Sequence, residues 1–441
     1  MFFLLSFIQF VDGSENFFMT ILVQILKKEW NLNSIQIELL GSLYYIGLFC
    51  GAIVAGFACD YYGRRKTTQF GNFVTLITVI WTAFAQNFIQ MCIIRALYGF
   101  VVGFTIPIGL IISTEICPKE IRGRTLIIIE SAHLLGKFYL IFLCFIFLKS
   151  LEEGNWRGIA VCQLIPIFIM TLGCLIYMEE SPRYLLAQNR LEESIKVINK
   201  IGKMNHNQNW VNITENEIEK LQNWQIQAFQ NIKKASFFDL FKGYNLSITW
   251  RLSVANSNTQ FLVAGCSFII PFIFHSEGFG LIDFFYATLG EIPASFVVYA
   301  LIDTQKVGRL KIIQLSLFLC CLSTLFIYFF QEKILVFGLA GLLFFSRFTT
   351  LASAPLIGES YDTLYRSMGL GFCAAMGRSI GSLAPFVVYE VFLWNKWSVF
   401  LIFTGCIFAT LIMFVMYPGE KTNSNLDAGQ IDENQNNIKN K

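Results

Sequence analysis

Long apolar segments separated by short polar ones run along most of the 441-residue chain. A helix needs about 20 predominantly apolar residues to cross the hydrocarbon core of a bilayer. By that measure the chain holds twelve spans in two groups of six, at 1–26, 36–57, 68–86, 88–113, 125–148 and 157–178, and then at 252–274, 279–301, 312–331, 333–357, 368–394 and 397–417. The pattern predicts an all-α membrane protein with twelve transmembrane helices in two six-helix bundles.

The same pattern divides the chain into four parts. We expect an N-terminal bundle at 1–178, a central loop at 179–250, a C-terminal bundle at 251–417 and a disordered tail at 418–441. The loop is rich in Asn, Gln and Lys and contains a helical run, LEESIKVINKI. The tail is too polar to bury the apolar surface that folding requires.

Lys and Arg residues are concentrated on one set of connections between the spans. Besides the central loop, this set carries Arg64, Arg65, Lys66, Lys119, Arg122, Arg124, Lys306, Arg309 and Lys311. The opposite set carries only Lys27, Lys28, Lys149, Arg157, Lys333 and Lys396. Because short loops rich in Lys and Arg stay on the cytoplasmic side, both termini and the central loop are expected to be cytoplasmic.

The composition excludes a soluble protein, since only 14% of the residues are charged against about 25% in soluble domains. The net charge of +3 gives no reason to expect nucleic acid as a partner. The 12 cysteines are scattered without a CxxC pair or a His cluster, so we interpret them as small buried hydrophobes and expect no metal or other cofactor. No basic segment or cleavage site indicates a cleaved signal peptide, although a missing upstream segment would leave the same abrupt start.

Charged and strongly polar side chains occur inside several predicted spans. A charge at the centre of a membrane helix costs about 2.5–3.5 kcal/mol on insertion scales, so such residues are expected to face a cavity or a partner. The candidates for a cavity that binds a solute or a coupling proton are Asp12, Glu15, Glu130, His133, Lys137, Asn256, Gln260, Glu291 and Arg378.

The fifth span carries three of these candidates. Spacings of three and four place Glu130, His133 and Lys137 on one helix face. Structural roles remain open for some of them, since Glu130 could pair with Lys137 and His133 could be a packing residue. Glu291, beside Pro293, could instead stabilise a kinked helix.

Charged motifs recur at corresponding places in the two halves. Asp60, Gly63 and Arg64 follow the second span, as Asp303, Gly308 and Arg309 follow the eighth. Glu115 is followed seven residues later by Arg122, as Glu359 is followed by Arg366. Two parallel repeats of six helices are typical of one large class of transporters.

Three ordered motifs carry a resemblance to the major facilitator superfamily. GFACDYYGRRK (56–66) resembles its loop between the second and third helices. RALYGFVVGFTIPIGLIISTEICPKEIRGR (95–124) and EESPRYLL (179–186) resemble motifs of the sugar-porter, organic-ion and synaptic-vesicle-protein-related branches, with Glu179 in place of the usual proline. The resemblance implies a conformational latch made by Asp60, Gly63, Arg64, Arg65, Arg95, Glu115, Arg122, Arg183, Asp303, Arg309, Glu359 and Arg366. Alternatively, the basic members only set the topology.

Two further motifs bear on the solute. The seventh span lacks the QQ motif usual in sugar porters, which disfavours a hexose. DGSE (12–15) resembles the first-helix element of aromatic-acid/proton symporters and synaptic-vesicle-related proteins, and GRSIGSLAPF (377–386) resembles their eleventh-helix pattern. The resemblance implies secondary transport of a small organic anion, with Arg378 and then Lys137 as the cationic groups and Asp12 or Glu15 as the proton-coupling acid. Asp12 and Glu15 are expected to face these two cations across the cavity.

Several alternatives remain at this stage. Facilitated diffusion, a sugar or an organic cation as solute, and a non-transporting vesicle or organelle protein of the same fold are all open. An ATP-driven pump is disfavoured because the chain lacks a GxxxxGK[ST] loop, and no nucleophile, base and orienting group can be placed together for an enzyme. We expect a monomer in the lipid bilayer of a plasma or vesicle membrane.

Overall fold

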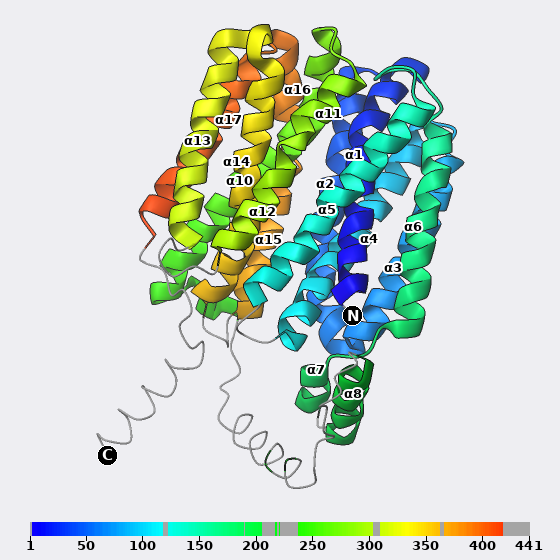
Figure 1. Ribbon diagram of the computed structural model, residues 1–441, viewed down its shortest axis with the longest axis vertical. Helices are drawn as coiled ribbons and strands as arrows, with labels where there is room; N and C mark the ends of the chain where they lie inside the picture. The colour runs from blue at the N-terminus through cyan, green and yellow to red at the C-terminus, as the bar shows by residue number, and fades with distance from the viewer. Residues whose placement is uncertain are drawn as a thin grey trace.

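The computed structural model describes residues 2–117, 122–188, 190–204, 217, 220, 237–302, 309–361 and 366–417, and nearly all of them are helical. The N-half consists of α1 (Phe2–Glu29), α2 (Ser34–Tyr62), α3 (Arg64–Ala83), α4 (Phe88–Ile116), α5 (Arg122–Phe147) and α6 (Trp156–Tyr177). The C-half consists of α10 (Gly243–Ser276), α11 (Leu281–Leu289), α12 (Glu291–Leu301), α13 (Arg309–Phe330), α14 (Leu335–Ser360), α15 (Arg366–Gly381), α16 (Ala384–Trp394) and α17 (Ser398–Val415). Each of the twelve predicted spans coincides with one of these helices or with a consecutive pair (Figure 1).

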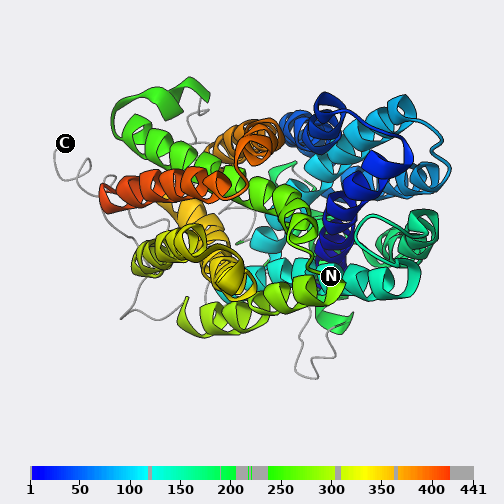
Figure 2. The same cartoon turned by 90° about the horizontal axis from the view of Figure 1, so that it is seen from above.

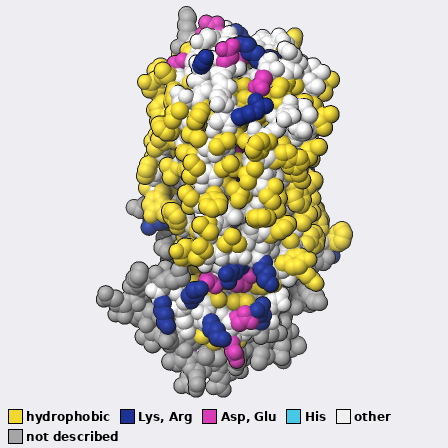
Figure 3. Space-filling model, turned by 90° about the vertical axis from the view of Figure 1, so that its right-hand side faces the viewer, with side chains coloured by type: hydrophobic (Ala, Val, Ile, Leu, Met, Phe, Trp, Pro, Cys, Tyr) yellow, Lys and Arg dark blue, Asp and Glu magenta, His cyan; other side chains and the backbone are white. Residues whose placement is uncertain are grey.

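The two halves lie side by side, as the view along the helices in Figure 2 makes clear. We call the end of the bundle that carries the short helix α8 (Leu191–Met204) the α8 end, and the end where α1 stops at Glu29 the far end (Figure 1). Hydrophobic side chains cover the middle of the face shown in Figure 3, and charged side chains gather near its two ends. This is the surface of a protein that sits in a bilayer.

Ten segments of the described chain are long and apolar enough to cross a membrane by length and composition alone. The first and third predicted spans, α1 and α3, are not among them. Polar residues explain this, because α1 contains the DGSEN stretch at its centre and α3 begins with three cations and carries many threonines.

Two of the predicted spans are broken helices. The span at 279–301 divides into α11 and α12 at Gly290, and the span at 368–394 divides into α15 and α16. Pro293 and Pro385 lie in the first turn of the second helix of each pair. Proline lacks the backbone N–H that would continue the preceding helix, so each break follows from the local sequence.

Close contacts between helix backbones hold the N-half together at glycines. A Cβ atom on Gly51 of α2 would lie 1.9 Å from the backbone oxygen of Phe100 in α4, and one on Gly13 of α1 would lie 1.9 Å from that of His133 in α5. Only glycine permits such approach of two helices. Gly13 therefore explains one position of the DGSE motif: it lets α1 pack directly on the helix that carries Glu130 and His133.

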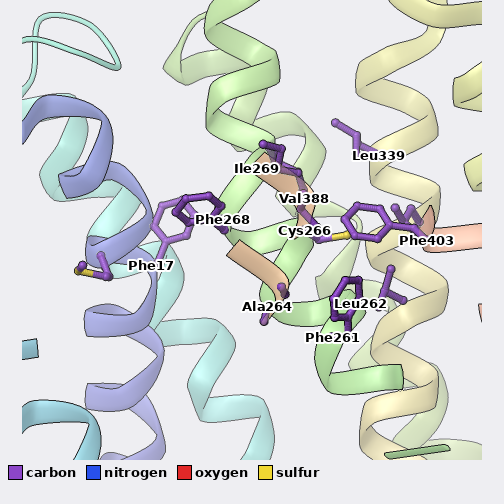
Figure 4. Packing of buried hydrophobic residues seen from close by; sticks show 14 of the residues in the cluster. Phe17, Phe261, Leu262, Ala264, Cys266, Phe268, Ile269, Leu339, Val388 and Phe403 are labelled. Atoms are coloured by element: carbon purple, nitrogen blue, oxygen red, sulfur yellow. The ribbon is translucent and has the colours of Figure 1, made fainter. Parts of the chain in front are cut away.

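The apolar core of the C-half centres on α10. Figure 4 shows Phe261, Leu262 and Cys266 of this helix packed towards Phe403 and Leu339, while Phe268 points towards Phe17 of the N-half. This core packs around a helix that also faces the N-half.

The central segment contains the predicted helical run as part of α8, preceded by α7 (Pro182–Ala187) and followed by the 3₁₀ helix η2 (Phe237–Phe241). Ser181 caps α7 by accepting a hydrogen bond from the Tyr184 backbone N–H. The helix α10 begins at Gly243, earlier than the predicted bundle boundary at 251, because the helix continues past its apolar part. The predicted disordered tail lies outside the described residues.

Candidate functional site

Five charged or titratable side chains from both halves lie between the halves near the middle of the bundle. This central cluster consists of Asp12 of α1, Glu130 and His133 of α5, Arg347 of α14 and Arg378 of α15. All except Arg347 were predicted as cavity residues. Their helices bring the two acids and the imidazole from the N-half and the two arginines from the C-half.

Asp12 is held by aromatic and imidazole groups rather than by a lysine. The Tyr44 hydroxyl donates a hydrogen bond of 3.0 Å to Asp12 Oδ1, and His133 Nε2 lies 3.8 Å from Oδ2. The ring of Tyr44 stacks on Tyr98 at 5.9 Å between centroids. The His133 side chain keeps 26% of its surface exposed, so this pair is reachable by water.

Glu130 accepts a hydrogen bond of 2.6 Å from Gln9 Nε2. The expected alternative, a pair between Glu130 and Lys137, is not formed. Lys137 instead makes an ion pair with Glu291 of α12, which links the two halves. Its ammonium also lies 5.6 Å from the ring centroid of Phe17. Lys137 therefore already has a counter-ion and is a weaker candidate for binding an anion.

The two arginines of the C-half contact backbone oxygens of the N-half. Arg347 Nη2 donates a hydrogen bond of 2.6 Å to the carbonyl of Glu130. Arg378 Nη1 donates long hydrogen bonds of 3.5 Å to the carbonyls of Leu48 and Gly103. Within the described part of the chain, neither guanidinium group forms an ion pair with a carboxylate. Arg378 nevertheless interacts electrostatically with Asp12 and Glu130.

Glu15 and Arg95 form a buried ion pair inside the N-half. Arg95 Nη1 lies 3.4 Å from Glu15 Oε2, and the two side chains are 1% and 0% exposed. The structure thereby corrects two expectations. Glu15 does not face Lys137 or Arg378, and Arg95 lies in the far-end part of α4 rather than with the predicted latch. The reason is that position 15 points away from the C-half, towards α4.

Asn256 and Gln260 lie one turn apart on α10, beside Gly377 of α15. Asn256 Nδ2 donates a hydrogen bond of 2.7 Å to the carbonyl of Cys373. A Cβ atom on Gly377 would lie 2.5 Å from Asn256 Nδ2 and 2.9 Å from Gln260 Cγ. Asn256 thus joins α10 to α15, and Gln260 is half-buried next to it.

At the α8 end, part of the predicted latch is assembled within the N-half. Arg64 Nη2 lies 3.3 Å from Glu115 Oε1. The start of α3 is held by Glu180, whose Oε1 accepts hydrogen bonds from the Arg64 and Arg65 backbone N–H groups at 2.9 and 3.2 Å. Gly63 has φ 90°, and a Cβ there would lie 2.4 Å from Glu180 Oε2. Glycine at 63 therefore permits both the turn and the approach of this carboxylate.

Other latch residues take different places. Arg65 Nη1 lies 3.6 Å from Glu179 Oε2, which gives a role to the residue that replaces the usual proline. Arg183 is exposed, and Arg309 is buried at the start of α13. Asp303 lies outside the described residues, as do the side chains of Asp60, Arg122, Glu359 and Arg366.

Contacts at the far end also join the halves. His275 Nε2 of α10 lies 3.2 Å from Glu152 Oε2 in the connection between α5 and α6. The Lys27 ammonium of α1 lies 5.5 Å from the ring centroid of Phe272 in α10. Together with the contacts in the central cluster, these two interactions join the halves in the middle of the bundle and at the far end.

Sequence reasoning missed Arg347, Tyr44, Gln9 and Glu180. Arg347 lies within the apolar run GLLFFSRFTTLA, so the criterion of a charge inside a span would have found it. Tyr44 and Gln9 carry no such signal, because isolated tyrosines and glutamines are tolerated in membrane helices. Among the described residues there is no group of three or more His, Cys, Asp or Glu side chains that could hold a metal ion.

Comparison with known proteins identifies the family. The family model for the sugar (and other) transporter matches residues 3–427. The synaptic vesicle 2-related protein of Xenopus laevis is 24% identical over 432 residues, which cover 90% of this chain and 73% of that protein. Solute carrier family 22 member 1 of Oryctolagus cuniculus is 24% identical over 373 residues, covering 81% and 62% of the two chains.

The fold also matches solved structures. The proton:xylose symporter XylE bound to 6-bromo-6-deoxy-D-glucose superposes with a TM-score of 0.77 at 15% sequence identity, with 97% of each chain covered. At this identity the likeness shows the fold alone, and it confirms the predicted twelve-helix major facilitator fold. Because the family model matches nearly the whole chain, this protein belongs to the sugar (and other) transporter family of the major facilitator superfamily and is a membrane transporter rather than an enzyme.

Proposed function

We propose that this transporter moves a small organic anion across the membrane together with a proton, by alternating access. One observation carries the proposal. Arg378 reaches from the C-half into the acid-bearing face of the N-half, where it donates hydrogen bonds of 3.5 Å to two carbonyl groups and forms no ion pair with a described carboxylate. A guanidinium group in such a place is suited to bind a carboxylate with two parallel hydrogen bonds.

The charges between the halves give the coupling a physical basis. The pairs Glu15–Arg95 and Lys137–Glu291 are each neutral. The remaining groups are two acids, Asp12 and Glu130, and two arginines, with His133 beside them. When both acids are ionised the four groups sum to zero, and when both are protonated they carry two positive charges. Protonation and anion binding therefore favour each other, and this coupling is reciprocal.

Asp12 is the better candidate for the coupling acid than Glu15. Protonating Glu15 would leave the Arg95 guanidinium buried without a counter-ion, which costs about 3–5 kcal/mol when one partner of a buried pair is lost. Asp12 has no lysine or arginine at ion-pair distance among the described residues, and its hydrogen bond comes from the neutral hydroxyl of Tyr44. Asp12 also lies beside His133, whose side chain is 26% exposed, and a proton can arrive there through water.

The same contacts suggest how the solute triggers the change between inward-facing and outward-facing states. Arg347 and Arg378 tie the C-half to backbone oxygens of the N-half. An anion that binds these groups competes with those contacts, so the halves become free to rearrange around it. A solute shifts the populations of the inward-facing and outward-facing states only if it binds one of them more tightly than the other.

The orientation proposed from the loop charges places the α8 end in the cytoplasm. Arg64, Arg65 and Lys66 lie there at the turn between α2 and α3, together with the basic residues of α8. Cations at this end would face the anionic inner leaflet. A plasma or vesicle membrane and a monomeric state remain part of the proposal.

Uptake into liposomes that contain the purified protein tests the proposal. A panel of radiolabelled organic acids, sugars and organic cations is offered with and without an inward proton gradient, against protein-free liposomes. We expect at least one organic acid to accumulate only with the gradient, and Arg378→Gln to abolish this accumulation. Arg190→Gln, which alters an arginine exposed on the surface, is the matched control and is expected to retain it.

A sugar or an organic cation is the second candidate for the solute. The name of the matching family and the solved proton:xylose symporter with the same fold support a sugar. The acids Asp12 and Glu130 would attract a cation if the arginines turned away. Accumulation of a sugar or a cation, with every organic acid excluded, would replace the proposal with this alternative.

A further inference from the structure

Arg347 is an unusual residue for its position. It lies within α14 in the apolar run GLLFFSRFTTLA, and the residue is 8% exposed. A cation at this depth is expensive and is tolerated where it faces a partner or a water-filled path. Arg347 therefore needs a partner for its charge.

The contacts of Arg347 do not neutralise its charge. Nη2 donates to the backbone carbonyl of Glu130 at 2.6 Å, but this is a neutral oxygen within a helix. Nε is buried and has no hydrogen-bond partner among the described groups. A buried donor without a partner costs about 1–3 kcal/mol, and more when the group is charged. A negatively charged ligand would satisfy both the charge and the free donor.

Arg347 and Arg378 share one electrostatic partner. Both interact electrostatically with the carboxyl group of Glu130, although they come from the different helices α14 and α15. Both also reach across to backbone oxygens of the N-half. By contrast, Arg95 and Lys137 are already paired with Glu15 and Glu291. The interface thus holds two guanidinium groups that have no carboxylate at ion-pair distance among the described residues.

We infer that Arg347 and Arg378 together bind a solute that carries two negative groups, such as a dicarboxylate, and that Arg347 determines the preference for a dianion over a monoanion. The inference rests on the proposed transport of an organic anion and names the class of that anion. Arg378 binds the carboxylate that a monoanion and a dianion both carry, and Arg347 binds the second carboxylate of the dianion. Two protonated acids in the cluster leave two positive charges, which match a dianion.

The test measures binding to the purified full-length protein by isothermal calorimetry at mildly acidic pH. The probes are aliphatic dicarboxylates of four to eight carbons and phthalate, each compared with its monocarboxylate analogue. We expect wild-type protein to bind at least one dicarboxylate about 10- to 100-fold more tightly than its analogue, as one additional hydrogen-bonded charge pair provides. Arg347→Gln should remove this preference and leave the monocarboxylate within about threefold, whereas Arg378→Gln should weaken both.

Two controls distinguish a change in binding from a loss of folding. Arg347→Lys retains the charge and is expected to recover part of the preference, and each variant is accepted only if it elutes as wild type does on size exclusion. Monocarboxylate binding with no dicarboxylate preference, or equal weakening of both by Arg347→Gln, would overturn the inference and leave the proposed function standing. Failure of every acid to bind wild-type protein would overturn both.

Discussion

The carboxylate of Glu15 and the guanidinium of Arg95 lie 3.4 Å apart in the interior of the N-half, and both side chains are excluded from solvent. The pair joins α1 to α4 next to the helix turn that presents Asp12 to the other half. Several polar atoms of the pair, among them Glu15 Oε1 and Arg95 Nε, have no hydrogen-bond partner among the described groups. The pair thus depends mainly on its own mutual attraction.

This dependence predicts a strong and non-additive effect on stability. Glu15→Gln or Arg95→Gln alone leaves one buried charge unpaired and should lower the free energy of unfolding by about 3–5 kcal/mol. The double variant removes both charges and should recover much of the loss. Equilibrium unfolding in mixed micelles measures all three variants. Single variants within 1 kcal/mol of wild type would show that the pair is solvated.

Gly13 and Gly405 offer a matched pair of helix glycines. A Cβ at Gly13 would collide with the backbone of His133, whereas a Cβ at Gly405 of α17 meets no atom within 4 Å. We expect Gly13→Ala to destabilise the protein by at least about 1–3 kcal/mol through overpacking. Gly405→Ala should be neutral or stabilising by up to about 1 kcal/mol. The measurement compares the shifts in melting temperature of the two variants from wild type. Equal shifts would argue against the close packing of α1 on α5.

Glu180 is predicted to stabilise the start of α3. Its carboxylate accepts hydrogen bonds from the Arg64 and Arg65 backbone N–H groups, where the helix dipole favours a negative charge. Glu180→Gln should cost about 0.5–2 kcal/mol of stability. Glu193→Gln, which changes an exposed ion pair on α8, should cost less than about 1 kcal/mol. The contrast is measured by thermal unfolding, and an equal cost would mean that Glu180 is not needed at this turn.

Glu277, at the far end of the C-half, contributes to the free energy of unfolding in a way that depends on pH. Burial acts to raise the pKa of Glu277, but hydrogen bonds from Lys396 and Glu332 outweigh it and hold the pKa below its usual range. Because the folded-state pKa is lowered, the contribution is present above the pKa of the unfolded chain, about 4.3, and is lost as the pH falls through the lower folded-state value.

We therefore expect Glu277→Gln to cost about 1.5–3 kcal/mol near neutral pH, and this difference from wild type should shrink below about pH 4. Unfolding curves at a series of pH values measure it. In a Lys396→Met background the same substitution should have much less effect, because the main partner is gone. A difference that stays constant down to pH 3 would rule out the lowered pKa.

Sequence patterns predicted the helices well but not which charges meet. Twelve apolar runs were enough to place the spans, since backbone hydrogen bonds leave helices as the natural structure for such segments in lipid. The glycine contacts at Gly13 and Gly51 determine which helix faces meet, and these contacts cannot be inferred from one helix alone. For this reason Arg95 was included in the predicted latch, although its partner is Glu15.

The candidate site was only partly predicted, and the reason is the same. The criterion of charge at membrane depth found Asp12, Glu130 and Arg378, which do lie between the halves. It also selected Lys137, whose partner Glu291 was itself a candidate, so two expected solute contacts became one ion pair. Partners depend on the packing of the halves, which no periodicity in the sequence describes.

Coupled movement of the proton and the anion can be measured in one experiment. Liposomes containing the protein enclose a pH-sensitive dye, and an organic acid that wild-type protein accumulates in the uptake panel is added outside. We predict that wild-type protein acidifies the interior in proportion to anion uptake, and that Asp12→Asn protein still exchanges the labelled anion but produces no acidification. Anion uptake by wild-type protein without acidification, or the same acidification with Asp12→Asn, would contradict the account.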